Sequence, residues 1–175
     1  MQETKTFETN KKIALLSVQF VLFVAIVTIA PMIKQQFIVG PLVNATLFIS
    51  AATLGTAGAI MIGLIPSVIS LSTGLLPAVL APVIPFIMIS NAILVLVFAG
   101  LKKRNFFLGV VSASVLKYLF LYATSSVVIS LILKKEVAKQ VVLMMSWPQL
   151  VTALIGGVIA YSFLRVLRHK TAYED

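Results

Sequence analysis

The 175-residue sequence contains no cysteine and very little charge. Without cysteine it has no disulfide framework and no cysteine-based metal site. Asp, Glu, Lys and Arg together make up 11% of the residues, whereas a soluble domain carries about 25%. Hydrophobic residues make up 60%, and the mean hydropathy is +1.10. This composition argues against a soluble enzyme and favours a protein that crosses a membrane several times.

Acidic residues and histidine are the scarcest of the chemically active side chains. The only histidine, His169, lies in the charged C-terminal tail, and the five acidic residues also fall outside the long apolar runs, at Glu3, Glu8, Glu136, Glu174 and Asp175. Proton-coupled carriers usually need a carboxylate or histidine inside the membrane, and metal sites need a cluster of such ligands. No phosphate-binding loop of the form GxxxxGK(S/T) occurs either. We therefore expect no catalytic site, metal or cofactor, and any uphill transport must draw its energy from a partner.

Long apolar runs are what the sequence has in abundance. From Gln35 to Leu101 it contains no Asp, Glu, Lys or Arg, and a bilayer core takes about 20 apolar residues per helix. Divided at its proline and glycine residues, the chain predicts an all-α integral membrane protein with six transmembrane helices, at 13–33, 39–54, 56–75, 83–101, 105–133 and 148–167. We expect a polar N-terminal tail at 1–12, a six-helix transmembrane domain at 13–168 and a C-terminal tail at 169–175.

The basic residues predict how this bundle lies in the membrane. They flank the apolar runs instead of forming one patch, so the net charge of +9 does not indicate nucleic-acid binding. Six helices with both termini in the cytoplasm leave Lys34, Lys134, Lys135 and Lys139 outside, and every other basic residue except Lys117 inside. Cytoplasmic loops are enriched in lysine and arginine. The enrichment would vanish if the long apolar run held only two helices, so six helices with both ends inside are favoured.

Lys117 is the most informative residue inside a predicted helix. It lies about 12 residues into the fifth helix, near the middle of the membrane. A lysine at that depth costs about 2.5–3.5 kcal/mol on insertion scales and is tolerated where it meets a partner or water. No predicted helix offers an acidic partner, so the candidates are backbone carbonyls, Asn44, Asn91, water or an anionic ligand. Lys117 is therefore a candidate ligand-binding residue, and a purely structural role is the alternative.

A few other polar or aromatic side chains in the helices are candidates for ligand contact. We expect Asn91 to contact a ligand and Asn44 to join two helices, although hydrogen bonds between helices are common enough to explain both. Trp147 and Gln149 stand at the external start of the sixth helix, where tryptophan is also enriched for lipid reasons alone. Tyr122 lies one helix turn beyond another tyrosine, for which packing is the simpler explanation.

Small residues form one further pattern. They recur every four residues at Ala51, Gly55, Ala59, Gly63 and Ser67, and similar pairs occur in the sixth helix. Stripes of this kind let helix backbones approach closely. They predict either close packing inside this chain or docking on a partner membrane protein.

Three segments resemble those of the S components, the substrate-binding membrane subunits, of energy-coupling factor (ECF) vitamin transporters. They are PLVNATLF at 41–48, LPAVLAPVIPFIMISNAILVL at 76–96 and MMSWPQLVTALIGG at 144–157. The resemblance covers most of the chain, from residue 12 to residue 168. It implies a subunit that is not itself an enzyme and that binds a vitamin or related micronutrient with high affinity from outside a prokaryotic cell. It also implies partners in the cell membrane, namely a T component and two ATPase subunits.

The same resemblance implies where the pocket and the docking surface lie. In this family the loop between the first two helices and helices four to six form the pocket, which points here to Gln35, Asn91, Lys117, Tyr122, Trp147 and Gln149. An AxxxA motif in the first helix often docks on the T component. Here Ser17, Val21 and Ala25 have that spacing, with a bulkier middle residue. The docking candidates are Ser17 and Ala25, together with Gly55, Ala59 and Gly63 from the stripe.

We thus predict high-affinity capture of a small solute and its delivery into the cell. Lys117 would pair with a carboxylate or phosphate, Asn91 would fix the orientation of the ligand, and Trp147 would cover an apolar or planar part. The main alternative is a non-transporting membrane subunit or assembly protein that binds partner helices. A passive channel is less well supported, because the polar residues in the helices are few and one-sided.

Overall fold

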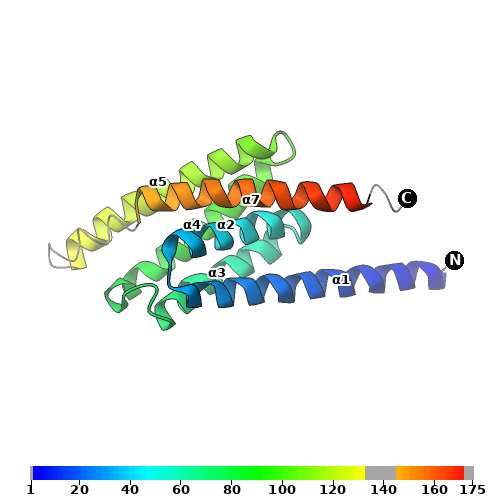
Figure 1. The fold of residues 1–175 in the computed structure, drawn as a ribbon, viewed down its shortest axis with the longest axis horizontal. Coiled ribbons are helices and arrows are strands. Elements are labelled where there is room, and N and C mark those ends of the chain that lie inside the picture. The colour runs from blue at the N-terminus through cyan, green and yellow to red at the C-terminus, as the bar shows by residue number, and fades with distance from the viewer. Residues whose placement is uncertain (1, 133–144, 172–175) are drawn as a thin grey trace.

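The computed structural model, which describes residues 2–132 and 145–171, is a bundle of long helices (Figure 1). The described helices are α1 (Gln2–Ile29), α2 (Gln36–Thr53), α3 (Thr56–Ser72), α4 (Ile84–Leu101), α5 (Phe106–Ile132) and α7 (Trp147–Thr171), with 3₁₀ segments η1 (Ala30–Ile33) and η2 (Ala78–Val83) between them. Within these ranges, five stretches are long and apolar enough to cross a membrane, and the shorter apolar α3 brings the set to six. The predicted all-α, six-helix membrane fold is thereby confirmed.

The helix boundaries follow the predicted ranges closely, with two differences near the N-terminus. α1 begins at Gln2, so the polar residues that we expected to form a separate tail continue the first helix. α2 begins at Gln36 rather than Val39, which places Pro41 inside the helix. Because proline has no N–H to donate to the carbonyl four residues earlier, α2 lacks one backbone hydrogen bond near its start. α3 runs on through Pro66 to Ser72.

The helices alternate between two ends of the bundle. α1 begins and α7 ends at one end, and the short loop between α4 and α5 lies there too (Figure 1). We call this the terminal end. At the other end, which we call the mouth end, η1 leads into α2, η2 leads into α4, and α7 begins. This alternation agrees with the topology that the basic residues predict, with both termini on one side of the membrane.

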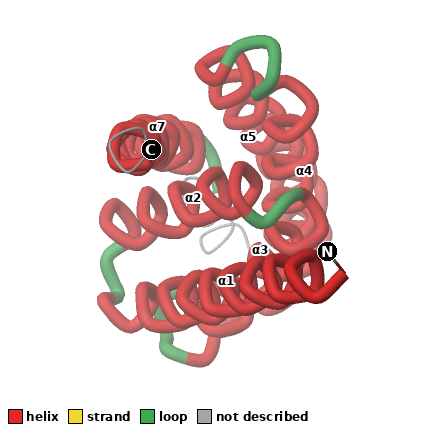
Figure 2. Tube along the Cα trace, turned by 90° about the vertical axis from the view of Figure 1, so that its right-hand side faces the viewer, coloured by secondary structure: helices red, strands yellow, loops and turns green. Residues whose placement is uncertain are grey.

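α2 is the central helix of the bundle. It packs against α1, α3, α4 and α7 (Figure 2), and its segment from Val43 to Ala51 is buried throughout. Phe48 of α2 and Phe98 of α4 are fully buried, with ring centroids 4.8 Å apart. Between membrane helices such contacts stabilise through van der Waals packing rather than through exclusion of water. α1 lies at the edge, with only 11% of its apolar span buried.

Small residues let α7 lie close against α2. A Cβ atom added to Gly156 would lie 2.8 Å from the backbone nitrogen of Ala45 and 2.9 Å from the carbonyl oxygen of Pro41. A Cβ atom on Gly40 would lie 2.8 Å from the side chain of Thr152. Two helix backbones can approach this closely only where side chains are nearly absent. The small residues of the sixth predicted helix therefore serve packing within the chain.

Gly156→Ala tests this close approach. The added methyl group would meet backbone atoms of α2, which cannot rotate away, so we expect the free energy of unfolding to fall by about 1–3 kcal/mol. Gly100→Ala in α4 is the matched control, because nothing lies within 4 Å of a Cβ atom there. The control should be neutral or slightly stabilising, since alanine is favoured over glycine in a helix. Thermal unfolding of the purified protein in detergent measures both, and a Gly156→Ala protein as stable as the wild type would contradict the packing described.

Candidate functional site

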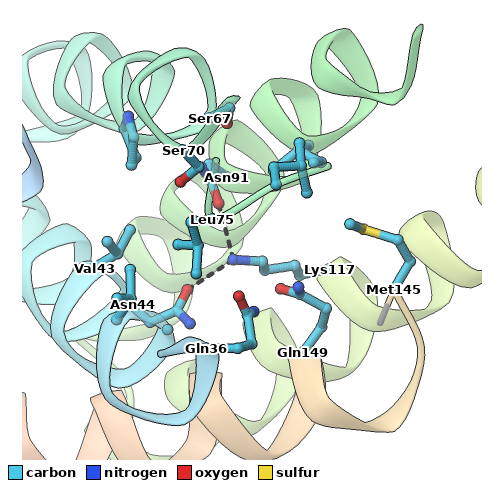
Figure 3. A pocket seen from close by; sticks show the side chains of 15 residues that line it. Gln36, Val43, Asn44, Ser67, Ser70, Leu75, Asn91, Lys117, Met145 and Gln149 are labelled. Carbon is cyan, nitrogen blue, oxygen red and sulfur yellow. Dashed lines mark hydrogen bonds between the residues drawn. The ribbon is translucent and has the colours of Figure 1, made fainter. Parts of the chain in front are cut away.

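A small cavity of about 70 Å³ lies inside the bundle, toward the mouth end (Figure 3). Every long helix except α1 contributes to its wall, together with the connection between α3 and α4. The lining residues combine apolar walls with a few polar groups and are Gln36, Val39, Gly40, Val43, Asn44, Pro66, Ser67, Ser70, Leu75, Leu76, Ile87, Asn91, Lys117, Met145 and Gln149. Such a mixture is typical of a small-molecule site.

Lys117 of α5 is buried in the wall of this cavity, with 3% of its surface exposed. Its ammonium nitrogen Nζ donates to Oδ1 of Asn44 at 2.7 Å and to Oδ1 of Asn91 at 2.8 Å. These are short distances, as expected when the donor carries a charge. The two asparagines that the sequence offered as partners for Lys117 are therefore both its partners in the structure. One side chain joins α2, α4 and α5.

The amide of Asn91 is held in the orientation that Lys117 requires. Its Nδ2 donates to the carbonyl oxygen of Gly63 in α3 at 2.8 Å, which turns Oδ1 toward the ammonium group. The approach is close because Gly63 has no side chain, and a Cβ atom there would lie 3.3 Å from Cβ of Asn91. α3 thus fixes the rotamer of a residue on α4, and through it the position of the charge on α5.

Ser67 of α3 adds an unpaired polar group to the cavity wall. Its side chain is buried, and its hydroxyl has no hydrogen-bond partner among the described residues. A buried hydroxyl without a partner costs free energy, so a ligand atom or water that bonded to it would recover that cost. Gln36 and Gln149 lie beside Lys117, nearer the mouth end (Figure 3). With Ser70, the polar side chains of the cavity lining therefore comprise one cation, two hydroxyls and four amides.

No carboxylate balances the charge of Lys117 within the described residues. Glu3 and Glu8 belong to the first turns of α1, at the terminal end. Glu136 lies outside the described residues, as do Glu174 and Asp175. The only groups described as bonded to the ammonium are neutral amides. The cavity is therefore electropositive.

The structure brings together some of the residues predicted to bind substrate. Asn91, Lys117 and Gln149 all line the cavity. Gln35 is exposed and precedes α2, whereas its neighbour Gln36 lines the cavity instead. The roles of the asparagines also overlap, because Asn44 lines the cavity as fully as Asn91.

Two aromatic residues of the predicted site lie outside the cavity wall. Tyr122 is 46% exposed, and its ring centroid lies 5.9 Å from that of Tyr118. Trp147 is 55% exposed, and its ring centroid lies 6.0 Å from that of Phe37 at the mouth end. Contact of either with a ligand stays a prediction.

Sequence reasoning passed over Gln36, Ser67 and Met145 as individual ligand-facing residues. Gln36 carried a signal, because it is polar and adjoins the loop where a contact was expected. Ser67 was noticed only as the last member of the stripe of small residues. Nothing in the sequence distinguishes Met145 from its neighbours.

The residues predicted to dock on a partner divide into two groups. Ala59 and Gly63 are buried within the chain, where Gly63 meets Asn91 and Leu47. They belong to internal packing, one of the two readings that the stripe allowed. Ser17 is exposed on α1, and Ala25 and Gly55 are half-buried. Docking through these three stays a prediction.

A double-mutant cycle tests the bond between Asn91 and Lys117. Asn91→Leu removes one of the two amides and leaves the ammonium under-satisfied, so we expect the free energy of unfolding to fall by about 1–3 kcal/mol. Asn91→Leu combined with Lys117→Met removes both partners and should recover part of that loss, because two apolar groups of similar shape leave little unsatisfied. Additive effects of the two changes, measured by unfolding in detergent, would mean that the residues do not interact.

Comparison with known proteins identifies the family. The family described as ECF transporter, substrate-specific component, matches residues 12–167. This range begins within α1, ends within α7 and contains the whole cavity wall. No curated protein and no solved structure matches the chain. Since the family match covers nearly the whole sequence, from the first apolar helix to the last, the chain belongs to the substrate-specific components of ECF transporters.

Proposed function

We propose that this chain binds a small anionic micronutrient, a vitamin or related compound, from outside the cell and delivers it inward with a T component and two ATPase subunits. The observation that carries the proposal is the ammonium of Lys117, buried beside a cavity and bonded only to neutral amides among the described residues. Membership of the substrate-specific components supports the role of a substrate-binding transport subunit.

The side from which the ligand enters follows from the charges at the two ends. Basic residues gather at the terminal end, in the loop at 102–104 and at Arg165, whereas Lys34 is the one described cation at the mouth end. Because lysine and arginine are enriched on the cytoplasmic side, the mouth end faces outward. The cavity lies toward that end, because its wall includes Leu75, Leu76 and Met145 from the chain connections there. A solute would therefore reach Lys117 from outside.

The chemistry of the cavity favours an acidic ligand group. An ammonium has three N–H donors, and the described bonds to Asn44 and Asn91 use two of them. A carboxylate or phosphate group could accept a hydrogen bond from the third N–H and another from the hydroxyl of Ser67. Such a bond is charge-assisted on both sides and forms away from water. Val39, Val43 and neighbouring apolar side chains would surround the uncharged part of the ligand.

The described cavity is too small for a vitamin. Its volume of about 70 Å³ corresponds to little more than two water molecules, at about 30 Å³ each in the liquid. Pockets for larger ligands measure about 300–1,000 Å³. Binding therefore requires the wall to move outward. Leu75 and Leu76 of the cavity wall belong to the connection between α3 and α4 and not to a long helix. This connection begins near Gly74, whose φ is +76°. It is the part of the wall that can move with the least loss of helix packing.

The energy for uptake has to come from outside this chain. The sequence has no phosphate-binding loop, and its five acidic residues lie outside the predicted transmembrane ranges. ATP hydrolysis by partner subunits supplies the energy in this proposal. In this proposal the T component docks on the face of α1 that carries the exposed Ser17 and the half-buried Ala25.

Lys117→Met tests the role of the buried ammonium. The ligand is first identified by mass spectrometry of small molecules that co-purify with the full chain. We expect the variant to bind that ligand at least about tenfold more weakly, because a buried hydrogen bond to a charge contributes about 1.5–3 kcal/mol. Isothermal titration calorimetry measures the affinity.

Two further variants make this result interpretable. Lys34→Met removes an exposed cation at the mouth end that does not line the cavity, so it should leave the affinity unchanged. Asn91→Asp places a carboxylate against Lys117. Because the carboxylate neutralises the charge of the ammonium, this variant should bind an anionic ligand more weakly while the bundle stays stable. Unchanged affinity in Lys117→Met would remove that residue from the site. A chain that retains no ligand but co-purifies with a membrane partner would favour the assembly-protein alternative.

Ser17→Phe tests docking through α1. Ser17 is exposed on a helix that packs only along one side, so a bulky ring should reduce co-purification with the T component while ligand binding persists. Val111→Phe on the exposed face of α5 is the matched control. If both variants retain the T component equally well, the docking surface lies elsewhere.

A further inference from the structure

Two adjoining cavities lie at the terminal end of the bundle, far from the cavity beside Lys117. Their volumes are about 550 Å³ and 480 Å³. They share Lys102, Phe106 and Leu164, and therefore form one feature around the start of α5 and the last turns of α7. We call this feature the basic cleft. Substrate binding at the mouth end does not use it.

Cations dominate the polar lining of the basic cleft. Its charged lining residues are all basic and are Lys102, Lys103, Arg104 and Arg165. The loop between α4 and α5 supplies three of them and α7 supplies the fourth. Four cations facing shared cavities repel one another unless an anion lies between them.

Lys102 is the most constrained of these cations. Its ammonium donates to the carbonyl oxygen of Ala51, in the last turn of α2, where it favourably meets the negative end of the helix dipole. Burial lowers the pKa of Lys102, and the neighbouring charge of Lys103 lowers this pKa further. A bound anion would offset both effects. The position of Lys102 therefore suits it to a negatively charged ligand.

The start of α5 adds a second attraction for an anion. Asn105 caps this 27-residue helix, with its Oδ1 accepting from the backbone N–H of Leu108 at 3.0 Å. The first turn of a helix carries partial positive charge. Asn105 also lines the cleft beside Arg104, so the helix end and the guanidinium groups act on the same space.

The other side chains that line the cleft are mostly apolar or aromatic. Phe106 and Tyr161 both line the cleft, and their ring centroids lie 5.4 Å apart. The ring of Phe107, which does not line the cleft, lies 4.7 Å from that of Tyr161 on the outer surface. Leu164 and Leu167 of α7 also line the cleft. Phe107 and Tyr161 are partly exposed on the outer surface of the bundle. A ligand that matches the whole cleft has an anionic head and an apolar body.

We propose that the basic cleft binds an anionic phospholipid of the cytoplasmic leaflet. The lipid phosphate lies between Arg104 and Arg165, whose planar guanidinium groups match phosphate oxygens. The acyl chains run along Phe106, Tyr161 and Leu164 into the bilayer. Basic pockets between membrane helices on the cytoplasmic side suit such headgroups. The apolar lining favours a lipid over free phosphate, which would use only the basic residues of the cleft.

Lipid retention by the purified full-length chain tests the proposal. The protein is placed in detergent with phosphatidylglycerol or with zwitterionic phosphatidylcholine, and native mass spectrometry measures the bound lipid. We expect the wild type to retain phosphatidylglycerol in preference. Arg104→Ala with Arg165→Ala should weaken this binding by about 30-fold, as two phosphate-facing cations are lost. Lys11→Ala with Lys12→Ala is the matched control, because it removes two exposed cations of the terminal end that do not line the cleft.

Further arms separate the lipid from other anions. Inorganic phosphate should displace phosphatidylglycerol poorly, since it lacks the apolar body. Equal retention of both lipids, equal losses in the two double variants, or phosphate binding as tight as lipid binding would overturn the proposal. So would a cleft variant that keeps its lipid but loses the T component, because the cleft would then serve a protein partner. Thermal unfolding confirms that the arginine variants fold, as expected for exposed side chains.

Discussion

The ammonium group of Lys117 lies within the helix bundle and is held by two neutral amides, one from α2 and one from α4. Moving an ammonium group out of water costs several kcal/mol even after the protein relaxes, and neutral amides offset only part of that cost. The charge is tolerated because Asn44 and Asn91 both point an oxygen at it, and because Gly63 of α3 holds Asn91 in place. Four helices thus converge on one cation, which lies in the wall of the cavity.

Close packing of α2 supports this arrangement. Gly40 and Gly156 allow α7 to lie directly against α2, which brings Gln149 to the cavity that Asn44 and Gln36 also line. The same helix packs against α1, α3 and α4. Small residues in the sequence therefore determine how closely the helices approach, and that approach determines which polar groups meet inside.

The sequence predicted the six helices and the two asparagines that bond Lys117 well, and the other residues of the cavity wall less well. Lys117 stood out because a lone charge in an apolar helix demands a partner. Tyr122 comes five residues later, about 140° around the helix axis, and Trp147 precedes Gln149 by two residues, about 160° around the helix. The side chains of Tyr122 and Trp147 are therefore directed away from the cavity that Lys117 and Gln149 line. Helices that are apolar on all sides carry no periodic signal to reveal this rotation.

The two ends of the bundle differ in charge and in the kind of cavity that they contain. Toward the mouth end a small cavity adjoins the buried Lys117, and at the terminal end several basic residues line the larger basic cleft. The central claim is that Lys117 binds the acidic group of the transported solute. A structure of the chain with its co-purified ligand tests this most directly. The account predicts an anionic ligand oxygen about 2.7–2.9 Å from Lys117 Nζ, between α2, α4 and α5. A ligand bound elsewhere, or one whose uncharged part faces the ammonium, would contradict it.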